Sequence, residues 1–278
     1  MSRLLLQAKT FYRYHLKGRY RWWQAKNVLR SDQQAVLVYT MAKVGSMSLT
    51  HSIQQQSNYP VFHIHSMHAS KIEEAYHLCR QKGWWPDSRQ TGALIHQQII
   101  QQNKPVKIIC TVRDPIARNI SAFFEVLPFY TQDSIRSRPN VQDLRAIYMQ
   151  QLPHDYPLLW MEEELLACLG IDVYHYKFDV KQKFLIIQKG NIELLLMRLD
   201  LPDVDKSTIL ASFLSCPNFQ LKNQNVGATK KYASLYRDFK HQIDLPEGYI
   251  RRLLEARYTQ HFFSEPERKA MYKQWKKS

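Results

Sequence analysis

A loop that carries a lysine and small residues follows an apolar run near the start of the chain. Residues 35–40 are apolar and β-branched, as expected of a buried parallel strand, and a helical pattern runs from Ser46 to about Gln56. In such a strand–loop–helix, successive backbone amides and the helix N-terminus point to one place and favour an anion. The loop therefore predicts a phosphate-binding site, with an ordinary turn and an exposed lysine as the alternative. Its residues are Lys43, Val44, Gly45, Ser46, Met47 and Ser48.

A second group of polar residues follows residues 107–112, which predict another buried strand. Asp114 is a typical N-cap and Pro115 a typical first helical residue, so a helix is expected to begin there. Arg113 leaves the carboxyl end of the strand, and Ser121 lies two turns into the helix. Ligands of open α/β sheets bind at that edge, and a guanidinium and a hydroxyl are suited to a phosphate. The alternative is an arginine that caps the sheet edge and a serine bonded to helix backbone.

Together the two motifs resemble those of the sulfotransferases that use 3′-phosphoadenosine 5′-phosphosulfate as donor. In that family a loop of the form Lys-x-Gly-Ser/Thr-x-Ser/Thr holds the 5′-phosphosulfate, and an Arg with a Ser eight positions later holds the 3′-phosphate. The resemblance implies that the residues of the loop, with Arg113 and Ser121, bind this donor. It further implies that Lys43 is catalytic, because it stabilises charge on the bridging oxygen during in-line displacement. Met47 stands where hydroxyl residues are common in the family.

The sequences of residues 112–124 and of the tail at residues 258–265 more specifically resemble those of bacterial capsular polysaccharide synthesis proteins, which are relatives of the carbohydrate sulfotransferases. The resemblance covers roughly residues 35–278. It implies that the acceptor is a hydroxyl of a glycan or of a capsular polysaccharide precursor. The sequence does not separate this acceptor from a lipid-linked sugar, a small alcohol or a protein tyrosine.

An acceptor hydroxyl needs a general base whose pKa lies near the working pH, and histidine meets that need best. His63 and His65 alternate with Ile64 in a predicted strand at residues 61–66, so both side chains are expected on one face near its carboxyl end. We predict His65 as the base, although a structural histidine bonded to backbone is the alternative for each. The other candidates are His63, His68, His96 and Glu125.

The alternatives to sulfuryl transfer are a nucleotide-dependent kinase and a nucleic-acid-binding protein. A kinase is disfavoured because GxxxxGK[ST] is absent, with Lys43 preceding Gly45, and because no Mg²⁺ carboxylate stands beside the loop; no metal is expected. A nucleic-acid-binding protein would explain the formal charge of +15. However, the chain has no recognition helix, zinc pattern or aromatic RNA motif. Nucleic acid is therefore not an expected partner.

The positive charge gathers at the N-terminus, where residues 1–30 hold eight basic residues and no acidic one. Apolar and aromatic residues recur at steps of three and four through residues 5–23, which predicts a basic amphipathic helix. Such a helix could lie on an anionic membrane or pack on its own domain. The chain has neither an 18-residue apolar run nor a signal-peptide core, and its four cysteines are scattered. A cytoplasmic protein, with peripheral membrane contact through residues 1–30, is the expectation.

Strand and helix patterns alternate from residue 35 onward. Further helices are expected near residues 71–81, 91–102, 157–169 and from 230, and Ser264 with Glu267 predicts a capping box. A strand is expected at residues 172–178 and a hairpin from residues 184–188 and 192–198. The pattern predicts an α/β domain over residues 31–278. The resemblance implies a P-loop-like, three-layer form of it, with a central, mainly parallel sheet flanked by helices.

Overall fold

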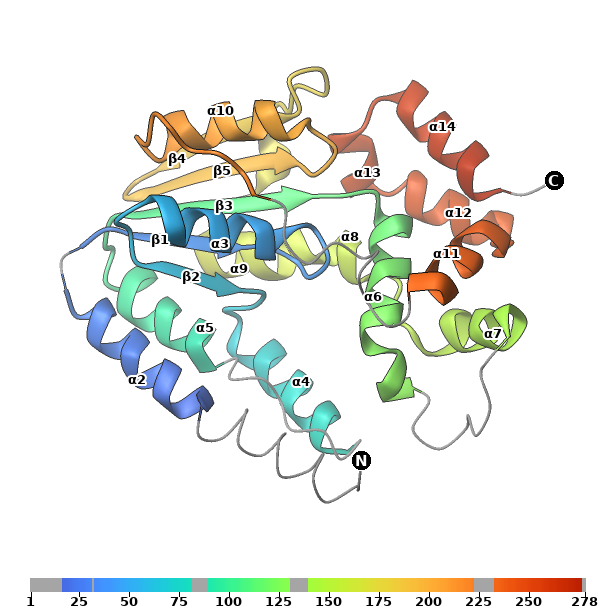
Figure 1. Cartoon of the computed structure of the whole chain (residues 1–278), viewed down its shortest axis with the longest axis horizontal. Coiled ribbons are helices and arrows are strands. Elements are labelled where there is room, and N and C mark those ends of the chain that lie inside the picture. Colours follow the sequence, from blue (N-terminus) through green and yellow to red (C-terminus); the bar gives the residue numbers. More distant parts are fainter. Residues whose placement is uncertain (1–16, 32, 82–89, 131–139, 223–232, 277–278) are drawn as a thin grey trace.

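The computed structural model describes residues 17–31, 33–81, 90–130, 140–222 and 233–276 (Figure 1). Its centre is a five-stranded sheet with the strand order β2-β1-β3-β5-β4. All neighbouring strands pair in parallel except β4 and β5, which form the predicted antiparallel hairpin. This confirms the predicted α/β fold with a mainly parallel sheet. The strands are β1 (Ala35–Tyr39), β2 (Val61–Ile64), β3 (Val106–Val112), β4 (Phe184–Lys189) and β5 (Ile192–Arg198).

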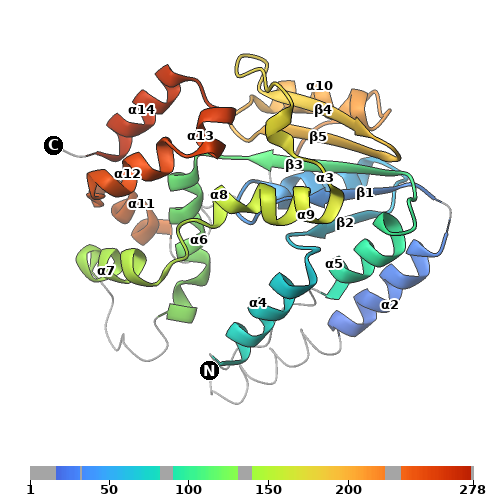
Figure 2. The same ribbon diagram turned by 180° about the vertical axis from the view of Figure 1, so that it is seen from behind.

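Helices cover both faces of the sheet, because alternate strand residues point to opposite sides. Leu37 and Tyr39 of β1 belong to the core on one face, and Val36 and Val38 belong to the core on the other. The first face is covered by α2 (Lys17–Leu29), α5 (Gln90–Ile95) and the helical run α8 (Tyr156–Trp160), η3 (Met161–Leu166) and α9 (Ala167–Leu169). The second is covered by α3 (Ser46–Gln56) and α10 (Asp203–Phe213) (Figures 1 and 2).

A third apolar cluster lies beyond the carboxyl ends of β1 and β3 (Figure 1). Phe123, Phe124, Tyr148 and Phe239 meet there edge to face or tilted, with ring centres 5.2 to 5.8 Å apart. Its helices pack around the first residues of the helix that follows β3. They are α6 (Pro115–Tyr130), α7 (Val141–Gln151), α11 (Ala233–Gln242), α12 (Glu247–Leu254) and α14 (Glu265–Trp275).

Two predicted helix caps are confirmed. Asp114 Oδ1 accepts hydrogen bonds from the backbone N–H groups of Ile116 (2.8 Å) and Ala117 (3.2 Å) at the start of α6. Ser264 and Glu267 form the capping box of α14. The other helical elements are α4 (Ala69–Gln81), α13 (Arg257–Phe262), the π-helical turn η2 (His96–Ile100) and the 3-10 turn η4 (Val173–His175).

The predicted strand at residues 172–178 is wrong. Asp172 accepts a hydrogen bond from the backbone N–H of Tyr174 at 3.0 Å and begins η4 instead. A local side-chain bond of this kind competes with a sheet ladder for the same backbone groups. The sheet therefore has β4 as its edge strand on this side.

The predicted N-terminal helix lies partly outside the described residues, which begin at Lys17. From there, α2 is helical, and Ala25 and Leu29 are buried in the core. The Leu29 carbonyl accepts a hydrogen bond from Lys104 Nζ at 2.8 Å. The described part of this helix thus packs on its own domain. Within the described ranges, we find no helix with the length and apolar character needed to cross a bilayer.

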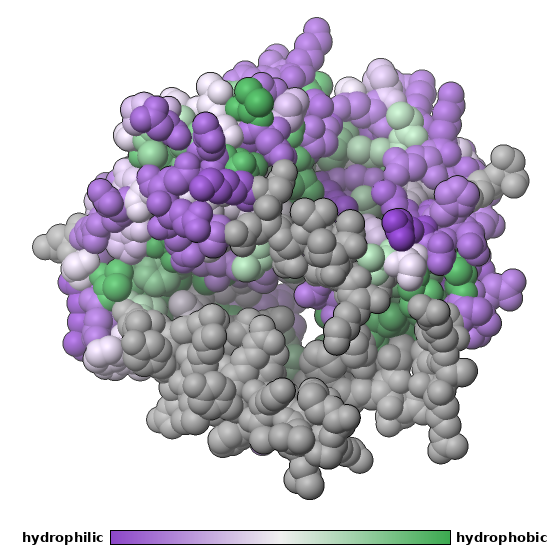
Figure 3. Space-filling model, viewed as in Figure 1, coloured by the Kyte–Doolittle hydropathy of each residue, from purple (hydrophilic) through white to green (hydrophobic). Residues whose placement is uncertain are grey.

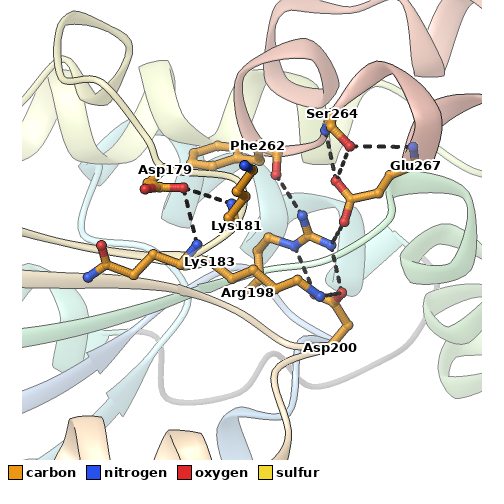
Figure 4. A network of polar contacts seen from close by, with 9 residues as sticks. Asp179, Lys181, Lys183, Arg198, Asp200, Phe262, Ser264 and Glu267 are labelled. Atoms are coloured by element: carbon orange, nitrogen blue, oxygen red, sulfur yellow. Dashed lines mark hydrogen bonds and ion pairs between the residues drawn. The ribbon is translucent and has the colours of Figure 1, made fainter.

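Arg198 at the end of β5 joins the sheet to the C-terminal helices (Figure 4). It is buried, and its guanidinium binds both carboxylate oxygens of Asp200 at 2.9 and 2.6 Å and Glu267 at 2.6 Å. Its third partner is the Phe262 carbonyl at 3.2 Å. Two carboxylates therefore compensate this buried cation. In the orientation of Figure 1, the surface over α10 and α14 is mostly hydrophilic (Figure 3).

A buried polar network connects the helices of the third cluster. His154 is 9% exposed; its Nε2–H donates to the Tyr148 carbonyl (2.9 Å), and its Nδ1 accepts from the Tyr249 hydroxyl (3.0 Å). The Asn119 amide of α6 donates to the His154 carbonyl at 2.9 Å. These bonds fit the neutral imidazole. Burial lowers the pKa of His154 from its usual value, and nearby Arg252 acts in the same direction.

Acid should therefore destabilise the protein through His154. The pKa of His154 is lower in the folded state than in the unfolded state, where it is about 6.5. The contribution of the neutral imidazole to the free energy of unfolding is therefore complete above pH 6.5 and is lost as the pH falls from there through the folded-state pKa. This loss has a slope of no more than about 1.4 kcal/mol per pH unit. Urea unfolding between pH 8 and 5 measures this slope. In His154→Gln the protein should be less stable at pH 8 and the slope below pH 6.5 should flatten. An unchanged slope would assign the acid sensitivity to other groups.

Candidate functional site

The loop between β1 and α3 has an unusual backbone. Lys43 and Gly45 both have positive φ angles, 74° and 82°, in the left-handed region. Gly45 is the N-cap residue of α3, and no described side chain caps this helix N-terminus. The first turn of a helix leaves N–H groups without intrahelical partners. The start of α3 therefore has backbone N–H donors in an arrangement that suits an anion.

Three successive carbonyl groups of the loop accept hydrogen bonds from side chains of β3, of α6 and of the short connection between them. In a trans peptide the N–H of the following residue points away from the carbonyl. The amides of Lys43, Val44 and Gly45 consequently point away from these donors, and successive amides of this kind form an anion-binding concavity. The three bonds are Arg118 Nε to Ala42 (3.0 Å), Arg113 Nη1 to Lys43 (2.8 Å) and Thr111 Oγ1 to Val44 (2.8 Å).

One face of α6 lies against this loop. Arg118 contacts the Ala42 carbonyl, and Glu125 forms an ion pair with Lys43 Nζ at 3.1 Å. Ser121 lies three residues after Arg118 and four before Glu125, which is the spacing of one helix face. Ser121 is therefore on the α6 face that carries both contacts to the loop. The predicted loop, Arg113 and Ser121 are brought together at one edge of the sheet.

The backbone of Arg113 is held by Tyr258 of α13. The Tyr258 hydroxyl donates to the Arg113 carbonyl (2.9 Å) and accepts from the Arg113 N–H (3.1 Å). Tyr258 is 1% exposed, and burial raises the pKa of its phenol well above its usual value. This tyrosine is thus a neutral residue that fixes the chain where β3 leads into α6.

His65 follows β2 and lies beside the end of β1. Its Nδ1 is 2.6 Å from the Thr40 carbonyl, three residues before Lys43. A carbonyl only accepts, so Nδ1 carries the proton and Nε2 is the basic nitrogen of the neutral ring. The Trp160 indole N–H donates to the His65 carbonyl at 2.9 Å. As predicted, His63 shares a face with His65, and their ring centres are 4.5 Å apart.

The remaining base candidates occupy different places. His68 Nδ1 is 3.0 Å from the Ser70 hydroxyl, just beyond β2. Glu125 is bonded to Lys43 on the loop side of α6. His96 lies in η2, on the segment that leads back to the start of β3 and so toward the opposite edge of the sheet. His65 forms a hydrogen bond to the chain segment that enters the loop.

A buried carboxylate that the sequence analysis missed holds the segment after His65. Glu164 of η3 is 3% exposed and accepts hydrogen bonds from the backbone N–H groups of Met67 (2.8 Å) and His68 (3.2 Å). It also accepts from the hydroxyls of Tyr39 (2.5 Å) and Ser66 (2.5 Å). These four N–H and O–H donors, with the Cys168 thiol at 3.9 Å, satisfy the carboxylate, and no cation of the described residues pairs with it.

Arg118, Thr111 and Tyr258 were also missed as site residues. Arg118 could have been found from its spacing to Ser121 and Glu125, since all three lie on one helix face. Thr111 reads as an ordinary strand residue, and nothing in the sequence pairs Tyr258 with Arg113. Among the described residues, no group of three His, Cys, Asp or Glu side chains is placed to hold a metal ion.

Gly45→Ala should disrupt this loop. The residue has φ 82°, and an added Cβ would lie 2.7 Å from Leu199 Cδ1. We expect the free energy of unfolding to fall by about 1 to 2 kcal/mol, measured in urea, because an alanine is strained in the left-handed region. Gly248→Ala in α12 is the control, since no atom lies within 4 Å of its added Cβ. Equal stability of the two variants would contradict the strained loop.

A family model described as "putative capsular polysaccharide synthesis protein" matches residues 137–264, which is less than half of the chain. The matched region contains Trp160, Glu164 and Tyr258, and it excludes the loop at residues 43–48 and Arg113. Searches of curated proteins and of solved structures gave no match. The C-terminal half of the chain is thus similar to this family.

Proposed function

We propose that the chain is a sulfotransferase that moves a sulfuryl group from 3′-phosphoadenosine 5′-phosphosulfate to an acceptor hydroxyl. The observation that carries the proposal is the 2.8 Å bond from Arg113 Nη1 to the Lys43 carbonyl, because it joins two anion-binding motifs at one sheet edge. This bond uses one of the five N–H donors of the guanidinium. The other donors suit a second phosphate near Ser121.

The residues at the loop fit a donor with two anionic groups. The amides that follow the bound carbonyls, together with the start of α3, would hold the 5′-phosphosulfate. Arg113 and Ser121 would hold the 3′-phosphate. Lys43 would stabilise the charge that develops on the bridging oxygen as the sulfuryl group leaves. Its ion pair with Glu125 would then be exchanged for contacts with the donor.

His65 would act as the general base toward the acceptor. With Nδ1 donating to the Thr40 carbonyl, the ring is fixed in the tautomer whose Nε2 can take a proton. In-line displacement places the acceptor oxygen opposite the leaving group, and no metal is needed in this scheme. We propose a glycan or a capsular polysaccharide precursor as acceptor, because the matched family's description concerns capsular polysaccharide synthesis.

The cell compartment is part of the same proposal. We propose that the reaction takes place in the cytoplasm, because the four scattered cysteines suit a reducing compartment. Residues 1–30 carry eight basic residues and no acidic one, which suits peripheral contact with an anionic membrane where glycan precursors are assembled.

The nucleotide product provides a direct binding test. Isothermal titration with 3′-phosphoadenosine 5′-phosphate should show saturable binding to the full chain. Arg113→Ala should weaken it at least about tenfold, since it removes charge-assisted bonds to a phosphate. Arg251→Ala is the control, because Arg251 lies on the exposed side of α12 and pairs with Glu247. Absence of binding to the wild-type chain at high micromolar nucleotide would overturn the donor, and Mg²⁺-dependent ATP turnover would favour a kinase.

His65→Ala tests the base. An acceptor is first found by mass spectrometry, as a glycan that gains one sulfuryl group when the donor is supplied. We then expect kcat to fall by about 10² to 10⁴, the usual contribution of general base catalysis, while nucleotide affinity changes little. His77→Ala in α4 is the control, because His77 is exposed and pairs with Glu73. Near-normal turnover by His65→Ala with intact donor binding would remove His65 as the base.

A further inference from the structure

Arg118 is a buried arginine in a setting unlike that of Arg198. Arg118 is 6% exposed and Arg198 is 2% exposed. Arg198 binds two carboxylates, whereas no carboxylate of the described residues pairs with Arg118. A buried charge is costly unless it is paired. Within the part of the chain that the structure describes, the charge of Arg118 therefore has no anionic partner at the edge of the sheet where the loop lies.

The contacts of Arg118 fix its position under the loop. Nε donates to the Ala42 carbonyl at 3.0 Å, and Nη1 donates to the Asn119 side-chain oxygen at 3.1 Å. The guanidinium stacks on Tyr156, with its carbon 4.3 Å from the ring centre. Burial lowers the pKa of Arg118 from its usual range, and nearby Arg113 adds to this. An anion bound at the loop would relieve the repulsion between these arginines.

We propose that Arg118 is a positioning residue of the anion site. It holds the Ala42 carbonyl so that the Lys43 amide points toward the ligand, and its charge stabilises a phosphate or sulfate group there. This inference rests on the proposed function, because it assigns Arg118 to the donor side of that reaction. Arg118 acts through the loop and through its field, so it differs from Arg113, which would contact the donor itself.

Two substitutions separate the charge of Arg118 from its hydrogen bond. Arg118→Gln removes the charge and keeps an N–H donor for the Ala42 carbonyl, whereas Arg118→Lys keeps the charge. Both are titrated as full chains with 3′-phosphoadenosine 5′-phosphate and with inorganic pyrophosphate, and their melting temperatures are measured without ligand. Arg251→Gln on the exposed side of α12 is the matched control.

We expect Arg118→Gln to weaken binding of both probes by about tenfold or more, with Arg118→Lys losing less and the control unchanged. Affinity of Arg118→Gln within twofold of wild type would overturn the proposal. Equal losses of affinity in both variants, in proportion to a lower melting temperature, would also overturn it, because they would indicate a purely structural residue.

The two probes distinguish this inference from the proposed function. If the wild-type chain binds pyrophosphate but not the nucleotide, the sulfotransferase proposal fails, and the pyrophosphate affinities of the variants decide the role of Arg118. If the nucleotide binds and Arg118→Gln binds it equally well, the proposed function stands and the role of Arg118 fails. If the wild-type chain binds neither probe, both are overturned.

Discussion

The pairing of β1 with β3 is the interaction on which the candidate site depends. The parallel ladder aligns Ala35 with Val106 and Val38 with Ile109, so both strands end at the same edge. Thr40 and Thr111 extend this alignment past the end of β1, because the Thr40 hydroxyl donates to the Thr111 carbonyl (3.0 Å) and accepts from its N–H (3.2 Å). A shift of register would separate the loop from the side chains that hold its carbonyls. Sheet pairing and anion geometry are therefore set by one constraint.

Three basic side chains lie together at this edge of the sheet. Lys43, Arg113 and Arg118 gather near the N-terminus of α3, where the helix dipole adds further positive potential. Two other buried charges are compensated: Arg198 has two carboxylates, and Glu164 accepts from four N–H and O–H donors. At the loop, Lys43 forms an ion pair with Glu125, and the buried Asp114 carboxylate interacts with Arg113. Among the described residues no carboxylate pairs with Arg118, which suits the anion that we propose at this edge.

Local sequence patterns predicted many of the helices and strands. Contacts between residues far apart in the sequence could not be predicted from such patterns. Strands, the hairpin, the start of α6 and the capping box of α14 depend on neighbouring residues, and the sequence indicated them. The strand expected at residues 172–178 failed because Asp172 forms a local turn that apolar alternation does not reveal. The contact of Glu164 with Ser66 joins residues 98 positions apart, so no spacing rule could have found it. The tautomer of His65 likewise depends on the Thr40 carbonyl, which only the fold brings near.

Residues of the region matched by the family model contact residues of the two motifs at the candidate site. The loop and Arg113 lie outside the matched residues 137–264, yet the matched region supplies Tyr258, which binds the Arg113 backbone on both sides. It also supplies Trp160, which binds the His65 carbonyl, and Glu164, which holds the segment after it. The matched region therefore holds in place both the arginine that we propose for the donor and the proposed base. A constraint on its sequence would be expected even if none of its residues touched a ligand, because these residues position the groups that do.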